Sequence, residues 1–563
     1  MGYVLTNLPF FLLLVGGLVI VHELGHFLVA RACGVRVLRF SIGFGPSLLQ
    51  VRRGATEYRV GLLPLGGYVK MLGDSTDGEL AAADAPFAFS TRPAWQRTAI
   101  VLAGPLANFL LAALVYTVLL SGSHWVNGTR MGIVMEDQPA WRAGLRPGDQ
   151  VTAVDGVPVT AWDALRKAVA ARPDGLLTLR FRRGEEAAER QIELRPEAHA
   201  EENMFQEQEA RGRIGISCQY VLPMLALVDP ESPAAMAGLQ DGDQVLQVGE
   251  RPVQAWHELR AAVQATPAGA PVRLRIRRGE EVLTRQLLPG TAPTGLDSLL
   301  ASAADGAAGA AAYTGLVARD VVVQRVEAAT PAATAGLRVG DRLLTLTQDQ
   351  ADGPAITRPI GVWSLDLAAG LDARLPLRLT WQRGRAIMTA PVQLTERAAA
   401  DEFNNSYQAI VFGAFNDPAQ LGSYQVEERR SPWGALVAGV GQVGQDIGLM
   451  GQVLRRLFVG RLPMNSVGGP IMLFVVAEKT AKRGASTFAR AMAFISVNLG
   501  VMNLLPIPTL DGGHLMFYAL EAVSRRQLSW RLREAANLVG LVLLLLLMAL
   551  SFRNDVLRFI VGS

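Results

Sequence analysis

The chain has 563 residues, which at roughly 150 residues per domain predicts about four structural units. Hydrophobic residues make up 50% and charged residues 18%, and the mean hydropathy is +0.23. These values exclude an intrinsically disordered chain and indicate segments that lie in a membrane. The net charge of +4 is too small to indicate a nucleic-acid partner. Cys33 and Cys218 are too few for a disulfide framework or a Cys-rich site, so a metal would need His and carboxylate ligands.

Four uncharged stretches are long enough to cross a bilayer, which takes about 20 apolar residues in a helix. They cover residues 1–21, 98–123, 491–510 and 535–552. The first stretch lacks the basic start and the small-residue cleavage site of a signal peptide. We therefore expect all four to be retained as membrane spans.

Positive charges are concentrated between the first two spans and between the last two, in residues 31–97 and 525–533. Because positively charged loops stay in the cytoplasm, both termini and the long middle region are predicted to lie outside it. In a bacterium with an outer membrane, this corresponds to an inner-membrane protein with a periplasmic middle region. Cys33 and Cys218 then lie on opposite sides of the lipid bilayer and do not pair.

The middle region contains one motif three times, in residues 143–149, 237–243 and 335–341. Each copy reads Ala-Gly-Leu, two variable residues and Gly-Asp, follows a proline with small residues, and precedes an alternating strand pattern. The spacing of roughly one hundred residues indicates a repeated module. The modules resemble bacterial PDZ domains, which bind a peptide at a sheet edge and its C-terminus in a backbone loop.

Two segments, 213–216 and 314–316, are candidates for such carboxylate-binding loops, and the sequence leaves open which repeat contributes which loop. The third repeat is more divergent, and the Ala/Gly-rich residues 301–312 before it are predicted to form a flexible linker.

The chemistry begins at His22-Glu23-Leu24-Gly25-His26 in the first span. On a helix, His22 and His26 lie one turn apart on the same face, so both imidazoles can reach one metal ion. Glu23 lies beside them and is suited to act as a base for a water molecule. Because charged and polar side chains inside a membrane span are costly, a functional role is favoured over two core histidines.

A third protein ligand is expected from residues 503–514, and the candidates there are Asp511 and His514. Two prolines at positions 506 and 508 break the third span, and two glycines at 512 and 513 permit unusual backbone angles. Non-helical backbone at membrane depth is tolerated only where it lines a cavity or is buried in protein. Asp511 is therefore placed to turn inward, and His514 remains the alternative.

Three motifs together carry a family resemblance: HELGH in the first span, GPLAN (residues 104–108) in the second, and NLLPIPTLDGG (503–513) in the third. In this order they resemble the site-2 intramembrane metalloproteases. The resemblance implies a polytopic α-helical membrane protein with four transmembrane helices, a membrane-associated β-sheet after the first helix, and periplasmic α+β PDZ-like domains. The best-known members have two such domains, whereas this chain has three repeats.

The resemblance also implies roles for individual residues. Zn²⁺ would be bound by His22, His26 and Asp511, and Glu23 would be the general base. Asn503 and Asn108 would help to position the substrate.

Residues 35–52 and 56–72 are rich in strand formers and in glycine, including Gly43, Gly45, Gly66 and Gly67. In the resembled family this region forms a sheet that dips into the membrane, and its edge pairs with substrate. A transmembrane helix must be unwound before its peptide bonds can be hydrolysed. Pairing with a sheet edge would replace the backbone hydrogen bonds that unwinding removes.

The predicted organisation has five parts. Residues 1–124 form an N-terminal membrane domain, residues 125–220, 221–318 and 319–417 form three PDZ-like modules, and residues 418–563 form a C-terminal membrane domain. Within the last part, residues 433–458 are predicted to form an interfacial helix, because Gln442, Gln445 and Asp446 interrupt its apolar character.

The function predicted by the resemblance is an intramembrane zinc metalloendopeptidase that cleaves the transmembrane segment of single-pass membrane proteins. The implied substrates are an anti-sigma-factor-like protein already trimmed by a first cut, or remnant signal peptides. A membrane metal transporter is the first alternative, but Glu23 has no evident use in a transporter. An inactive PDZ scaffold is the second, but no motif residue is missing. The PDZ-like modules would either bind peptide C-termini or filter substrates by size.

Overall fold

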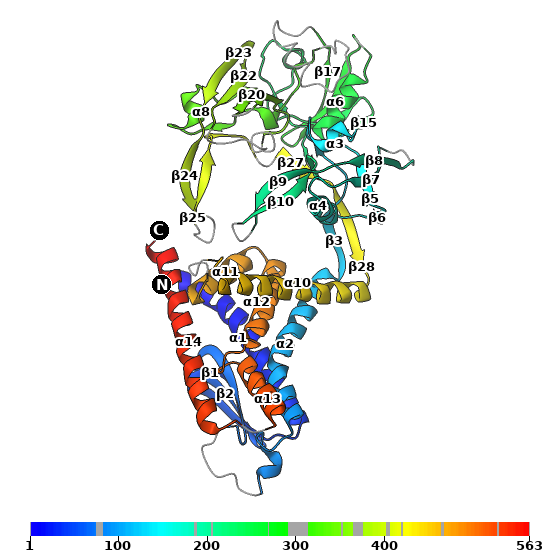
Figure 1. The fold of residues 1–563 in the computed structure, drawn as a ribbon. Coiled ribbons are helices and arrows are strands. Elements are labelled where there is room, and N and C mark those ends of the chain that lie inside the picture. The colour runs from blue at the N-terminus through cyan, green and yellow to red at the C-terminus, as the bar shows by residue number, and fades with distance from the viewer. Residues whose placement is uncertain are drawn as a thin grey trace. The chain divides into compact units, whose positions relative to one another are not determined.

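The computed structural model describes all residues except 1, 75–82, 185–187, 204–206, 268, 291–312, 351–352, 364–374, 401–405, 418–419, 463–466, 526–527 and 562–563. The chain divides into two compact units (Figure 1). The helical unit consists of Met1–His124, Ala400–Asn405 and Arg429–Ser563, and the β-rich unit of Trp125–Ala399 and Ser406–Glu428. The linker predicted at 301–312 lies outside the described residues.

Four helices of the helical unit are long and apolar enough to cross a membrane, as predicted: Thr6–Ala32, Ala94–Leu120, Ala485–Asn503 and Arg531–Ile560. They correspond to α1 (Gly2–Ala32), α2 (Ala94–Leu120), α12 (Ala485–Asn503) and α14 (Trp530–Val556). The run of leucines in α14 is largely exposed, as expected for a helix that contacts lipid. The cysteines are both free, as predicted.

The third span ends where the two prolines were expected to break it. Helix α12 stops at Asn503, residues 504–510 are not helical, and α13 (Asp511–Ser524) then begins. A Cβ at Gly512 would lie 2.3 Å from the carbonyl oxygen of Leu504, so the first turn of α13 packs directly on the broken segment. This contact fixes where Asp511, the first residue of α13, is held.

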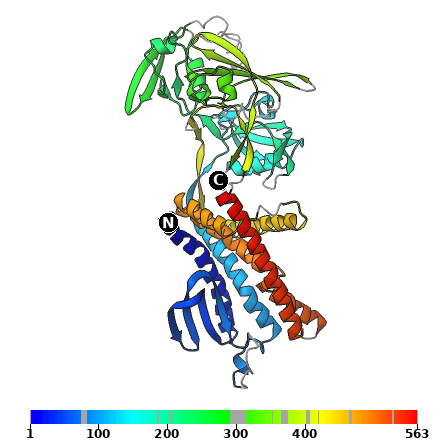
Figure 2. The same ribbon diagram turned by 90° about the vertical axis from the view of Figure 1, so that its left-hand side faces the viewer.

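The segment after α1 forms a sheet from two long strands, β1 (Val37–Arg53) and β2 (Thr56–Met71). Both strands bend, so each contributes two segments to the sheet. Residues 37–42 lie between residues 67–71 and residues 57–60 and pair with both. Residues 47–53 pair with residues 56–61. The rings of Phe27 on α1, Phe40 and Tyr58 pack together with centroids 5.3–6.2 Å apart. The predicted sheet is therefore present and lies against α1 (Figure 2).

Two further helices complete the helical unit, α10 (Pro432–Phe458) and α11 (Pro470–Lys482). Helix α10 corresponds to the predicted helix at 433–458, and it packs closely on the end of α2. The hydroxyl of Tyr116 donates to the buried carboxylate of Asp446 at 2.6 Å. At the start of α11, the buried carboxylate of Asp555 in α14 accepts from the backbone N–H groups of Gly469 and Ile471 at 2.9 and 2.8 Å.

The β-rich unit contains three four-stranded antiparallel sheets with the same strand order. In each repeat a short helix begins at the proline before the Gly-Asp motif: α3 (Pro139–Arg142), α5 (Pro233–Met236) and α8 (Pro331–Thr334). The sheets are β6-β5-β7-β8, β15-β14-β16-β17 and β21-β20-β22-β23. Their bounds, in chain order, are β5 Gln150–Val154, β6 Val157–Pro158, β7 Leu177–Arg182, β8 Arg190–Leu194, β14 Gln244–Val248, β15 Arg251–Pro252, β16 Val272–Arg278, β17 Glu281–Leu287, β20 Arg342–Gln350, β21 Gly353–Pro359, β22 Leu377–Arg383 and β23 Ala386–Val392.

A glycine loop follows the sheet of each repeat and packs on that repeat's short helix. The residue before the glycine accepts a backbone hydrogen bond from Ala140, Ala234 or Ala332 at 2.9–3.0 Å. The segment 213–216 therefore belongs to the first repeat, and 314–316 to the second. The third repeat has an equivalent loop at Phe412-Gly413 that was not predicted. The three loop glycines, Gly215, Gly315 and Gly413, have φ of 75°, 70° and 86°.

A buried ion pair locks the Gly-Asp turn of each repeat to the end of a strand. The aspartate is at most 1% exposed, and both of its oxygens accept from one arginine at 2.6–2.8 Å. Removing one partner would leave a buried charge and cost about 3–5 kcal/mol. The pairs are Asp149–Arg183, Asp243–Arg278 and Asp341–Arg383.

Contacts between repeats hold the β-rich unit together. Arg130 of the first repeat contacts Glu258 of the second at 3.0 Å. Tyr424, from the chain segment that follows the third repeat, donates to Glu258 at 3.2 Å and lies under the Arg130 guanidinium. Nearby, strand β12 (Gln219–Val221) pairs antiparallel with β27 (Leu421–Ser423). The chain therefore returns after the third repeat to the junction between the first and the second.

Candidate metal centre

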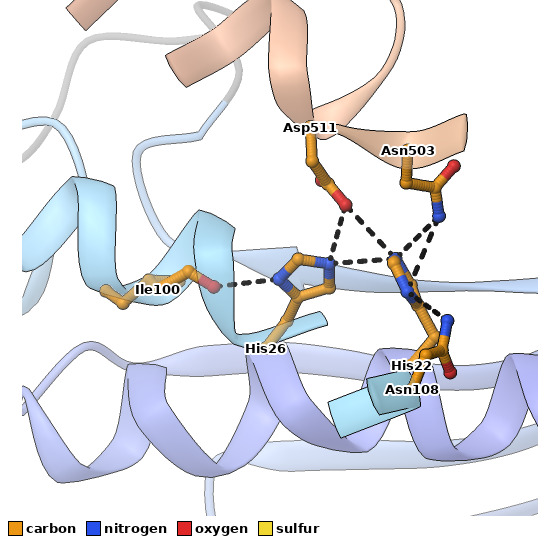
Figure 3. A network of polar contacts seen from close by, with 6 residues as sticks. All are labelled: His22, His26, Ile100, Asn108, Asn503 and Asp511. Atoms are coloured by element: carbon orange, nitrogen blue, oxygen red, sulfur yellow. Dashed lines mark hydrogen bonds and ion pairs between the residues drawn. The ribbon is translucent and has the colours of Figure 1, made fainter. Parts of the chain in front are cut away.

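Three potential metal ligands meet inside the helical unit, two from α1 and one from α13 (Figure 3). His22 and His26 are both buried, and their Nε2 atoms are 3.2 Å apart. Asp511 Oδ2 lies 3.2 Å from Nε2 of His22 and 3.5 Å from Nε2 of His26. The helical spacing of the two histidines and the break in the third span thus place three donor atoms around one point.

Hydrogen bonds on the far sides of the rings set which nitrogen carries the proton. Nδ1 of His26 lies 2.8 Å from the carbonyl oxygen of Ile100, which can only accept. Nδ1 of neutral His26 is therefore protonated, and its Nε2 presents a lone pair toward Asp511. Such an outer hydrogen bond is what orients histidine ligands of metals.

Asn108 on α2 performs the same task for His22. The Asn108 side chain is fully buried, its amide nitrogen lies 3.1 Å from Nδ1 of His22, and its Oδ1 has no hydrogen-bond partner. If the amide is turned by 180°, Oδ1 accepts from Nδ1–H of His22 and the buried oxygen is satisfied. In that arrangement, Nε2 of His22 also presents a lone pair to the centre.

The donor set fits a zinc ion. With both tautomers assigned in this way, two imidazole lone pairs and a carboxylate oxygen face one another at 3.2–3.5 Å. Such an arrangement is repulsive unless a cation lies among the atoms. Two histidines and one carboxylate, with a fourth position open, form a ligand set of catalytic zinc sites.

Gly104 on α2 lets the two transmembrane helices approach closely enough to enclose the centre. A Cβ at this position would lie 2.3 Å from Nε2 of His26 and 2.8 Å from Cε1 of His22. Only a glycine therefore leaves room for the two imidazoles, which explains in physical terms why this residue belongs to the motif in the second span.

Glu23 faces strand β2 of the sheet. A Cβ at Gly67 would lie 3.0 Å from Cγ of Glu23, so the Glu23 side chain passes close to the backbone of β2. Among the described pairings, residues 67–71 are bonded to a neighbouring strand along one side only. The carboxylate predicted to be the base thus lies beside an edge of the sheet.

The remaining candidate residues are distributed as follows. Nδ2 of Asn503 lies 3.3 Å from Nε2 of His22, at the rim of the centre (Figure 3). His514 packs its ring against Phe517, and the described ligand cluster contains Asp511 instead. Gly43, Gly45 and Gly66 all have positive φ, of 85°, 86° and 108°, and shape the bends of β1 and β2.

Known proteins resemble this chain over most of its length. The family model of Peptidase family M50 matches residues 10–547. A protein of Xylella fastidiosa (strain Temecula1), provisionally named a zinc metalloprotease, is 30% identical over 99% of this chain and 100% of its own length. The regulator of sigma-E protease RseP of Salmonella typhimurium (strain 14028s) is 28% identical over 99% of both chains. RseP of Escherichia coli (strain K12) is 28% identical over 98% of this chain and 99% of its own.

The match extends through both units and includes α1 and α13, which carry the three potential ligands. The chain is therefore a zinc metalloendopeptidase and belongs to Peptidase family M50.

Proposed function

We propose that this enzyme cleaves the transmembrane segment of single-pass membrane proteins, with His22, His26 and Asp511 as zinc ligands. The observation that supports the proposal most directly is the position of the ligand cluster. All three donors lie on or next to helices that are apolar enough to cross a membrane, so a peptide bond must reach them from within the bilayer.

A zinc ion held there would supply a Lewis acid that polarises the scissile carbonyl and acidifies water. Glu23 would then take a proton from the attacking water at its carboxylate and deliver it to the leaving nitrogen. The side-chain amide of Asn503, at the rim of the centre, would donate to the substrate backbone and hold it in place.

The sheet edge beside Glu23 suggests how a helical substrate becomes accessible. A substrate segment that unwinds and pairs with residues 67–71 would regain backbone hydrogen bonds and run past the Glu23 carboxylate. Gly66 and Gly67, which have no side chains, would leave room for that strand. Asn108, which is fully buried against His22, would act by orienting this ligand and not by direct contact with substrate.

The names of the relatives favour one substrate class. Two of them are named regulator of sigma-E protease RseP. The proposed substrate is therefore an anti-sigma-factor-like membrane protein that a first cut has already shortened. Remnant signal peptides share the required single apolar helix. The proposed location is the bacterial inner membrane, with both termini and the three PDZ-like repeats on the periplasmic side, because positively charged loops such as residues 31–97 stay in the cytoplasm.

The test is a Glu23→Gln variant expressed in cells and purified in detergent. Because the amide cannot accept the proton, the variant should retain zinc, lose cleavage, and co-purify with an uncut single-pass membrane protein. Glu281→Gln, an exposed site in the β-rich unit, is the matched control and should cleave normally. Full cleavage of the membrane substrate by Glu23→Gln would refute the proposed mechanism.

A further inference from the structure

The C-terminal end of α10 carries a concentration of positive charge that the proteolytic site does not use. A hollow of about 250 Å³ there is lined by Gln452, Arg455, Arg456, Val459 and Arg461. Three of these five residues are arginines, and none is acidic. Among the described residues, no ion pair involves Arg455 or Arg461, and both are exposed.

A tight backbone turn assembles this cluster. Helix α10 ends at Phe458, Gly460 follows with φ of 73°, and the N–H of Arg461 donates back to the carbonyl oxygen of Arg456 at 2.9 Å. This turn folds Arg461, which lies beyond the helix, onto the last turn that carries Arg455 and Arg456. The negative end of the helix dipole explains arginines within the last turn, but it gives no reason for a third one folded back beside them.

The exposed surface of α10 indicates which surroundings the arginine cluster has. One side of the helix packs on α2 through buried residues such as Ala435, Gly439 and Val443. A neighbouring stripe at helical spacing exposes large apolar side chains: Trp433, Leu436, Val437, Val440, Ile447 and Phe458. A polar side carries Gln445, Gln452 and Arg456. A helix with these three sides, which runs crosswise to α2 and α14 (Figure 1), is suited to lie at the surface of a membrane.

We propose that the arginine hollow binds the phosphate of an anionic phospholipid. Guanidinium groups match phosphate oxygens in pairs of parallel hydrogen bonds, and clustered basic residues at the bilayer surface attract anionic headgroups. Val459 lines the hollow and Phe458 precedes it, both largely exposed. They would contact the glycerol and acyl region while the arginines hold the phosphate, so the site fits a lipid and not a free ion.

The binding is measured with the full-length protein purified in detergent and titrated with phosphatidylglycerol or phosphatidylcholine, using native mass spectrometry. Phosphatidylglycerol should bind more tightly to the wild type. The variant Arg455→Gln/Arg461→Gln should bind it about 25-fold more weakly, since each arginine contributes about fivefold. The control Arg273→Gln/Arg275→Gln removes the same charge from exposed positions of the β-rich unit and should have no effect.

A variant with the wild-type zinc content is folded. Because the test measures lipid affinity and not cleavage, its result does not depend on the proposed proteolytic function. If the double variant fails to fold, Arg461→Gln alone, outside the helix, should reduce the affinity about fivefold. Equal binding of the two lipids by the wild type would overturn the proposal. Displacement of the lipid by inorganic phosphate would also overturn it, because the site would then hold a free anion.

Discussion

Replacing Gly104 by alanine should remove zinc from the metal centre. The added Cβ would lie 2.3 Å from Nε2 of His26, whereas ordinary contacts begin near 3.4 Å. The imidazole would therefore have to move by about 1 Å, several times the ~0.2 Å tolerance of a metal–ligand distance. Changes outside the ligand shell alone reduce metal affinity by about 10–100-fold, so displacement of a ligand should cost more than about 100-fold.

The same crowding is present in the zinc-free protein, where overpacking of this kind costs about 1–3 kcal/mol of stability. Zinc affinity, measured by competition with a chelator, and thermal unfolding of the zinc-free protein separate the two effects. Gly16→Ala in α1 is the matched control, since nothing lies within 4 Å of its Cβ position. Wild-type zinc affinity in Gly104→Ala would refute the assignment of the histidine pair as the metal site.

Three further predictions test other parts of the molecule. Asp511→Asn should lower the zinc content and abolish cleavage, whereas His514→Ala should keep its zinc. If metal analysis shows the opposite pattern, His514 and not Asp511 is the third ligand. Replacing residues 125–417 with a flexible linker should permit cleavage of an untrimmed substrate if the repeats act as a size filter. Slower cleavage of the trimmed form alone would instead indicate recruitment. Burial lowers the pKa of His257 to about 4, so below pH ~6.5 the unfolded chain binds a proton that the folded chain does not. Stability of the β-rich unit against denaturant should therefore fall as the pH drops from about 6.5 toward 4, and His257→Gln should flatten this dependence.

The sequence predicted the parts of the metal centre that depend on local spacing. His22 and His26 share a helix face because they are one turn apart, which requires no knowledge of the fold. The choice between Asp511 and His514 stayed open because two prolines precede them, and the direction of the next helix depends on packing. The contact of Asn108 with His22 could not be predicted for a related reason: it joins residues 86 positions apart, and no local pattern marks it.

In the repeats, too, the sequence analysis missed features that depend on the fold. Some of these features nevertheless have a recognisable sequence pattern. The glycine loop at 412–413 lies about one hundred residues after the loop at Gly315, so the repeat spacing could have located it. The arginines that pair with the buried aspartates each precede a glycine: Arg183-Gly184, Arg278-Gly279 and Arg383-Gly384. Their partners could not have been identified from this pattern, because the pairs form only after two strands have met.

The pairing of β12 with β27 has a consequence for how an array of this kind can grow. These strands close a loop that contains the second and third repeats, so these two repeats lie inside a closed ring that the first repeat precedes. The entropy of closing a loop rises only with the logarithm of its length, about 0.6 kcal/mol for each doubling. A duplicated repeat inserted inside the ring would therefore lengthen the loop with little loss of stability and leave its closing strands untouched. An array of three repeats could thus arise from a shorter one without any change where the chain enters and leaves the β-rich unit.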